Sequence, residues 1–315
     1  MHLATPSIRH RSRPQRARSR ARGDHRRVVL VVNANASGAA DIAARATHEL
    51  RAAGAAVRAR PTADEAELAA VVGDSDGARV VLAGGDGTVH ALANLDLPEL
   101  PPVALLPAGR ANNVARALGI PVDPRAAARL AVRGRPVRVD ALRVETPERG
   151  LFAVEGVSAG FHAAARHRYD GTNSADLGAG VRALAAQLRA FRPEHLALRL
   201  DGVRFADRPV AQVFLSNLPY FGFGFHVDPF ADAHDGLLEA IVLDARTRRS
   251  VVRALAAART GRHLEGQGTA WRRARRASID GPLPLVADAQ PLGVTTAHVA
   301  VAPGRLRLVA PEARP

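Results

Sequence analysis

The chain has 315 residues, a length that suits two domains, each with a core of its own. It has no cysteine, which excludes disulfides and cysteine-ligated metals and fits a reducing, cytoplasmic compartment. The net charge is +14, and all 44 basic residues are arginine. Such an excess of positive charge favours acidic partners: nucleotides, anionic lipid headgroups or nucleic acid. We expect neither a membrane span nor a signal peptide, because no apolar run is long enough.

Residues 1–27 form an arginine-rich tail. They carry nine arginines and one aspartate, a local charge of 9 − 1 = +8, and very few apolar residues. This composition predicts disorder. Two interpretations remain open: a dispensable extension, or an electrostatic tether to a membrane or a nucleic acid.

Strands and helices alternate over residues 28–136. Buried-type strands are predicted at residues 28–32, 57–60, 80–82 and 103–106. Helices are predicted at residues 42–53, 63–72, 114–118 and 125–132. Such alternation indicates parallel strands in a doubly wound α/β sheet.

Three of these strands end in polar, small-residue turns. The turns lie around Asn33, at Gly84-Gly85-Asp86-Gly87-Thr88 and at residues 109–113. Ligands of doubly wound sheets bind at the carboxyl ends of the strands, where glycines let the backbone approach phosphate oxygens. The three turns together predict a nucleotide site. Within it, Asp86 is placed either to hold Mg²⁺ or to cap the following helix.

Two familiar phosphate-binding motifs are excluded. The dinucleotide motif G-x-G-x-x-G fails because His90 stands where its third glycine should be. The P-loop fails because it needs a lysine, and the chain has none.

Residues 137–311 predict a second domain of a different class. Strands are predicted at residues 137–144, 151–158, 196–200, 210–216, 237–243, 297–301 and 306–309, with one helix at 177–191. Sequential strands with few helices indicate an all-β, antiparallel sandwich or barrel. Residues 246–276 contain ten arginines and one acidic residue. This segment fits either a solvated basic helix or a surface that faces a membrane.

Five motifs in a fixed order resemble the diacylglycerol kinase catalytic-domain family, particularly its soluble bacterial lipid kinases. Residues 84–94 resemble the pattern GGDGTxNEvxN, and residues 106–121 resemble LPxGTaNDfArxLGIP. Residues 157–161 resemble the glycine-phenylalanine turn that opens the second domain, residues 229–239 resemble PxAxxxDGLLE, and residues 286–291 stand at the DGEP position. NAD kinases share only GGDGT. The resemblance implies a nucleotide-binding α/β domain, a C-terminal antiparallel β-sandwich domain, and transfer of the ATP γ-phosphoryl group to a lipid hydroxyl.

The resemblance also implies the site residues. Asp86, Asp288 and Gln290 stand at catalytic positions. The implied nucleotide-binding residues are Asn33, Gly84, Gly85, Asp86, Gly87, Thr88, His90, Gly109, Arg110 and Asn112. An Mg²⁺ site is implied at Asp232, Asp235 and Leu237. The implied cofactors are ATP and Mg²⁺, and the implied partner is a lipid at the inner face of the cytoplasmic membrane.

Several positions depart from the family patterns. Gln290 replaces the glutamate of DGE, Arg110 replaces a threonine, and His90 replaces an asparagine. An amide cannot act as a general base. Three alternatives follow: Asp288 accepts the proton, the hydroxyl loses its proton late in a loose transition state, or the chain binds nucleotide or lipid without turnover. The sequence determines neither the acceptor lipid nor the oligomeric state, for which a homodimer is one option, and nucleic acid is the weakest candidate partner.

Overall fold

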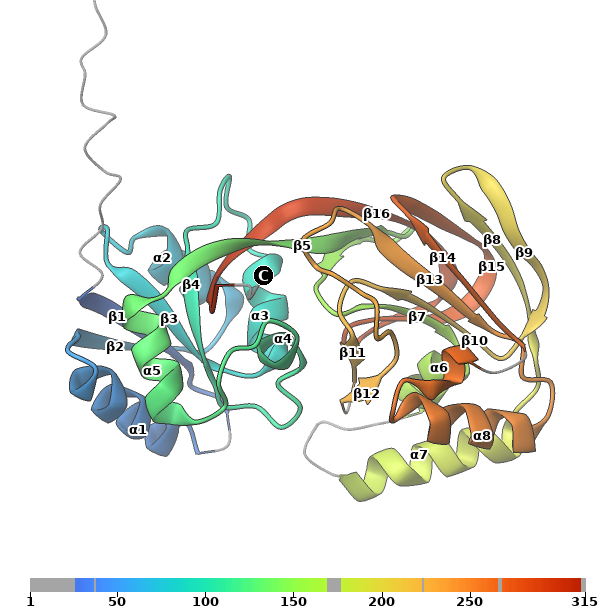
Figure 1. The fold of residues 1–315 in the computed structure, drawn as a ribbon, viewed down its shortest axis with the longest axis horizontal. Helices are drawn as coiled ribbons and strands as arrows, with labels where there is room; N and C mark the ends of the chain where they lie inside the picture. Colours follow the sequence, from blue (N-terminus) through green and yellow to red (C-terminus); the bar gives the residue numbers. More distant parts are fainter. Residues whose placement is uncertain (1–25, 37, 169–176, 223, 266–267, 313–315) are drawn as a thin grey trace, which may run out of the picture.

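A computed structural model describes residues 26–36, 38–168, 177–222, 224–265 and 268–312. It shows an α/β domain and a β-rich domain side by side, joined by long strands (Figure 1). The prediction of a disordered tail concerns residues 1–27, of which residues 1–25 lie outside the described part of the chain.

The first domain contains the predicted parallel sheet. Its strands are β1 (Arg27–Asn33), β2 (Ala56–Thr62), β3 (Arg79–Gly84) and β4 (Val103–Pro107). They lie in the order β2-β1-β3-β4, and all three pairings are parallel. The prediction of a doubly wound α/β domain is confirmed.

Helices cover both faces of this sheet. One face carries α1 (Ala39–Ala52) and α5 (Pro124–Arg133), and the other carries α2 (Glu65–Gly73), α3 (Asp86–Ala93) and α4 (Asn113–Ala117). Successive side chains of a strand point to opposite faces. In β3, Val80 and Leu82 accordingly pack in the core beneath α2 and α3, whereas Val81 packs in the core beneath α1 and α5.

Two long strands join the domains: β5 (Arg135–Glu145) and β16 (Gln290–Ala310). They pair antiparallel along most of their lengths and run across the top of Figure 1. Near its end, β16 also pairs in parallel with β4, Leu308 opposite Val103. The strands predicted separately at residues 297–301 and 306–309 are therefore one strand. Its last residues extend the first sheet, because the chain returns to that sheet after completing the second domain.

The second domain is the predicted antiparallel sandwich, built around one large apolar core. Its strands are β6 (Gly150–Ala153), β7 (Gly156–Gly160), β8 (Glu194–Leu200), β9 (Val203–Val210), β10 (Gln212–Ser216), β13 (Leu238–Leu243), β14 (Thr269–Ala274) and β15 (Arg276–Ala287). The sequence did not predict β9, β14 or β15. The single strand predicted over residues 151–158 is two strands, β6 and β7, because the backbone between them turns toward another part of the chain.

Short elements flank the sandwich. They are α6 (Phe161–His167), α7 (Leu177–Ala190), the hairpin β11 (Tyr220–Phe221) and β12 (Phe225–His226), α8 (Arg248–Ala258) and the 3₁₀ helix η1 (Arg262–Glu265). The hairpin lies between the two domains, and α7 and α8 lie along the lower edge of the second domain (Figure 1). In the part of the chain that the structure describes, no helix has the length and apolar character needed to cross a membrane.

Candidate active site

The three predicted polar turns lie at one edge of the first sheet. They follow β1, β3 and β4, which are neighbours in the sheet, and the register pairs Val32 with Ala83 and Gly84 with Pro107. The strand ends are thus level, and the turns project from the same edge. This is the arrangement that the sequence predicted from the chain order.

Two glycines let the second and third turns touch. A Cβ atom added to Gly109 would lie 2.5 Å from the Cα of Gly85, and one added to Gly85 would lie 2.8 Å from the Cα of Gly109. Side chains at these positions would push the two turns apart. A backbone hydrogen bond from the Ala108 amide to the Gly84 carbonyl, 2.9 Å long, joins the same turns. The glycines therefore create one continuous backbone surface at the edge of the sheet.

Asp86 is the first residue of α3 and lies beside this surface. Its Oδ1 atom accepts a hydrogen bond of 2.9 Å from the backbone N–H of Val114, at the start of α4. Burial raises the pKa of Asp86, and this hydrogen bond partly opposes the shift. Asp86 thus links two helix N-termini, whose backbone dipoles favour negative charge.

Asp288 brings the second domain to the same place. It lies in the turn between β15 and β16, with a φ of 51°. Its carboxylate accepts hydrogen bonds from three consecutive backbone N–H groups, those of Val154 at 2.8 Å, Glu155 at 2.7 Å and Gly156 at 3.1 Å. These bonds explain the break between β6 and β7, because the amides turn to Asp288 instead of continuing the strand. With all these donors, Asp288 anchors the backbone at residues 154–156, and its role as a proton acceptor stays a prediction.

His90, on α3, and Asn94, directly after this helix, join the first domain to the second. The Nδ1 atom of His90 lies 2.7 Å from Oδ2 of Asp288. The side-chain amide of Asn94 both donates to the carbonyl of Phe152 and accepts from its N–H, each at 2.8 Å. His90, predicted as a nucleotide ligand, therefore contacts the second domain through one ring nitrogen.

Two buried residues of this site, Asn113 and Glu155, were not predicted from the sequence. The Nδ2 atom of Asn113 donates to Oε2 of Glu155 at 3.0 Å and to the carbonyl of Gly222 at 2.8 Å. The N–H of Gly222 donates to the same Oε2 at 2.9 Å. Burial, and then the charges of Asp288 and Asp86, raise the pKa of Glu155 well above its ordinary value. One signal for Asn113 was present in the sequence, because the pattern LPxGTaNDfArxLGIP has an aspartate at this position.

The other predicted residues are exposed or form hydrogen bonds only within their own turns. Asn33 and Arg110 are exposed, and the Oδ1 atom of Asn33 accepts from the N–H of Asn35 at 2.9 Å. Asn112 exchanges two hydrogen bonds of 2.9 Å with the backbone of Gly109, so its amide holds its own turn in shape. Gln290, at the start of β16, is exposed.

The predicted metal residues lie in the loop before β13. Asp232 accepts from the N–H of His234 and Asp235 accepts from that of Leu237, so both carboxylates form local turns. Arg273 lies beside the loop, with its Nη1 atom 3.8 Å from Asp235. Within the described residues, no three histidine or acidic side chains are arranged to hold a metal ion. Binding of Mg²⁺ in this loop therefore stays a prediction.

Comparisons with known proteins place these features in a family. Residues 27–144 match the family model described as the diacylglycerol kinase catalytic domain, and residues 155–310 match the YegS C-terminal NAD kinase beta sandwich-like domain. The "Probable lipid kinase YegS-like" protein of Chromohalobacter salexigens is 31% identical over 261 residues, which are 79% of this chain and 81% of the relative. The diacylglycerol kinase of Mycobacterium tuberculosis is 27% identical and covers 78% of this chain and 80% of its own.

The fold agrees with a solved structure. The crystal structure of a diacylglycerol kinase from Bacillus anthracis superposes with a TM-score of 0.67 at 17% identity, covering 91% of this chain and 97% of the other. By its sequence matches, the chain belongs to the family of lipid kinases that combine a diacylglycerol kinase catalytic domain with a YegS-type C-terminal domain.

Proposed function

We propose that the chain is an ATP- and Mg²⁺-dependent lipid kinase that transfers the γ-phosphoryl group to the hydroxyl of diacylglycerol or a related lipid, a step of phospholipid metabolism. The observation that carries the proposal is the position of Asp86. It lies beside the backbone surface formed by Gly85 and Gly109 and within electrostatic reach of Asp288 in the second domain. Phosphoryl transfer depends mainly on positioning and charge stabilisation, and this arrangement suits both.

The residues fit a nucleotide. Turns without side chains at positions 85 and 109 give phosphate oxygens access to backbone N–H groups, and α3 directs its N-terminus to the same edge. A divalent cation bound with ATP would neutralise phosphate charge. In this chain, Asp86 holds the start of α4 in place through Val114, and Asp288 holds the backbone at residues 154–156.

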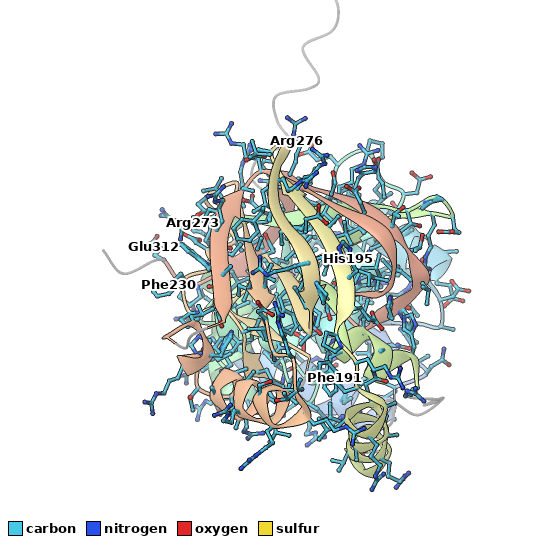
Figure 2. The ribbon with its side chains drawn as sticks, turned by 90° about the vertical axis from the view of Figure 1, so that its right-hand side faces the viewer. Phe191, His195, Phe230, Arg273, Arg276 and Glu312 are labelled. Atoms are coloured by element: carbon cyan, nitrogen blue, oxygen red, sulfur yellow. The ribbon has the colours of Figure 1, made fainter. Side chains whose placement is uncertain are left out.

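A basic surface supports contact with an anionic membrane, where a lipid acceptor would be found. Residues 177–192 and 246–262, which include α7 and α8, carry nine arginines and no aspartate or glutamate. Val181 and Val252 are 60% and 46% exposed on these helices. Figure 2 shows nitrogen-tipped side chains that project from the two helices away from the strands. Basic residues with exposed apolar neighbours are typical of peripheral membrane surfaces.

A second candidate, nucleotide or lipid binding without turnover, is favoured by Gln290, whose amide cannot accept the hydroxyl proton, and by Arg110, which replaces a threonine of the family pattern. The discriminating experiment is transfer of labelled γ-phosphate from ATP and Mg²⁺ to a panel of lipids in mixed micelles. Asp86→Asn can still accept the Val114 hydrogen bond, so a loss of activity would report the lost charge. Asp96→Asn, at an exposed aspartate just after α3, is the matched control.

We expect a labelled lipid with the unaltered chain and with Asp96→Asn, and none with Asp86→Asn. Binding without turnover would instead give no labelled lipid, while ATP still raises the melting temperature. Full activity of folded Asp86→Asn would overturn the assignment of Asp86.

A further inference from the structure

Asn113 and Glu155 form a buried pair between the two domains. Asn113 is fully buried, Glu155 is 5% exposed, and the amide nitrogen lies 3.0 Å from the carboxylate oxygen. Asn113 begins α4 of the first domain, and Glu155 lies in the break between β6 and β7 of the second. The two side chains meet only because the domains pack together.

One member of this pair, Asn113, differs in chemistry from the family pattern. The pattern LPxGTaNDfArxLGIP aligns with residues 106–121 and places an aspartate where this chain has Asn113. Relative to that pattern, position 113 carries an amide in place of a carboxyl group. The residue that its amide contacts, Glu155, has a carboxyl group, so an ionisable acid is still present about one hydrogen bond away.

We propose that the acid of this site has moved across the domain interface, so that Glu155 supplies the carboxylate that the family pattern carries at position 113 and phosphoryl transfer requires one carboxylate in this pair. The inference rests on the proposed lipid kinase function. Nothing in the family motifs singles out residue 155, because it lies between two of them.

The surroundings explain why one acid is needed and two are not tolerated. Asn113 adjoins Val114, whose N–H holds Asp86, and the N–H of Glu155 is held by Asp288. The Glu155 carboxyl thus lies in the same group as Asp86 and Asp288, whose charges help to raise its pKa. A second acid at position 113 would face Glu155 across a buried contact, and two carboxylates without a partner in such a place are strongly unfavourable. Glu155 acts as a positioning residue that keeps one ionisable carboxyl beside Asp86.

The ionisable carboxyl of Glu155 can be separated from its hydrogen bonds by an isosteric change. In Glu155→Gln the side-chain oxygen can still accept from Asn113 and from the N–H of Gly222, so a purely structural role would survive. We expect kcat/KM for lipid phosphorylation to fall by about 100-fold, the size of effect seen when one electrostatic group is lost from an active site. Glu194→Gln, on β8, is the matched control and should keep full activity.

The decisive variant returns the acid to position 113. Asn113→Asp alone should lose activity and lower the melting temperature, because two buried carboxylates then oppose each other. Asn113→Asp combined with Glu155→Gln should recover kcat/KM to within about tenfold of the unaltered chain, since one acid is again present. The proposal that the acid has moved from position 113 to Glu155 would be overturned by a folded double variant as inactive as Glu155→Gln. Full activity of Glu155→Gln would overturn it as well.

The melting temperatures keep this inference separate from the proposed function. If the unaltered chain labels no lipid, the kinase assignment fails, and the exchange is judged by stability alone. It then requires that Asn113→Asp lowers the melting temperature and that the added Glu155→Gln restores it. An Asn113→Asp variant as stable as the unaltered chain would refute the exchange.

Discussion

The Nδ1 atom of His90 lies 2.7 Å from the Oδ2 atom of Asp288, which joins a helix of the first domain to a turn of the second. Both side chains are largely buried, with 13% and 6% of their surfaces exposed. Four residues further along the chain, at the C-terminal end of α3, Asn94 pairs with the backbone of Phe152 in the second domain. Asp86 begins this helix, so the same element that carries the proposed catalytic aspartate also fixes the relative position of the domains.

Replacing His90 by alanine should therefore weaken the association of the domains. The variant loses a hydrogen bond to a buried carboxylate, and we expect the free energy of unfolding to fall by about 2 kcal/mol. Urea denaturation measures the change. A double-mutant cycle with Asp288→Asn should give a coupling energy of about 1 kcal/mol or more. His48→Ala, at an exposed position of α1, is the control. Additive effects of the two substitutions would show that the contact contributes nothing.

The contact between Gly85 and Gly109 gives a second prediction. In Gly109→Ala the new methyl group would lie 2.5 Å from the Cα of Gly85 and 2.9 Å from Oδ1 of Asn112. The backbone of Gly85 must move, and we expect a loss of stability of about 1–3 kcal/mol. The increase in melting temperature caused by ATP should disappear as well, because the two turns no longer form one surface.

Gly87→Ala is the matched substitution, because, apart from its chain neighbours and the backbone of its own helix, no atom of the described residues lies within 4 Å of the position that its Cβ would take. We expect its melting temperature without ligand to equal that of the unaltered chain. If ATP raises the melting temperature of this variant less than that of the unaltered chain, the phosphate binds against Gly87. Equal stabilities for Gly109→Ala and Gly87→Ala would contradict the close approach of the two turns.

The first domain could be predicted well because three of its strands, β1, β3 and β4, are largely buried and end in turns rich in glycine or asparagine. Residues 80–85 are an example, since the apolar run Val80-Val81-Leu82-Ala83 is followed directly by two glycines. The second domain was harder. The strands β9 and β14 carry several exposed arginines, such as Arg204 and Arg272, which hide the alternation of apolar residues.

The site itself shows where sequence reasoning stops. The turns at residues 84–88 and 109–113 could be found because their motifs are local. Glu155 could not, because it lies inside a stretch that looks like one continuous strand. The break that exposes its backbone N–H is caused by Asp288, which is 133 residues away in the chain. A carboxylate far away in the chain thus interrupts the strand, and the pattern of apolar residues over 151–158 does not indicate the break.

The basic surface of α7 and α8 gives a third prediction. Replacing Arg249 and Arg253 by glutamine should weaken binding to vesicles that contain anionic phospholipid by about 10- to 30-fold, since each basic residue near such a surface contributes about 1 kcal/mol. Arg125→Gln with Arg129→Gln, two exposed arginines of α5, is the control with the same loss of charge. Vesicle sedimentation at low and high salt measures binding. Equal losses for both pairs would indicate attraction by net charge alone, without a defined surface.

The last prediction concerns stability at acidic pH and rests on His162 of α6. Its Nδ1 atom lies 2.9 Å from Oγ of Ser158, and its ring packs against Phe214 and Phe221. Burial, assisted by the charge of Arg166, lowers the pKa of His162 to about 4. In the unfolded chain the pKa of histidine is about 6.5, so between these values the unfolded chain binds a proton that the folded chain excludes.

The stabilisation from neutral His162 is therefore complete above about pH 6.5 and is lost as the pH falls toward 4. From pH 7 to pH 4.5 the unaltered chain should lose about 2 kcal/mol more stability than His162→Gln, which has no group to titrate at this position. Urea denaturation followed by the fluorescence of Trp271, the one tryptophan and a residue of the same domain, measures this difference. The exposed His48→Gln variant should lose as much stability as the unaltered chain. Parallel losses in the unaltered chain and His162→Gln would mean that the folded protein accommodates a charged imidazole among these aromatic rings.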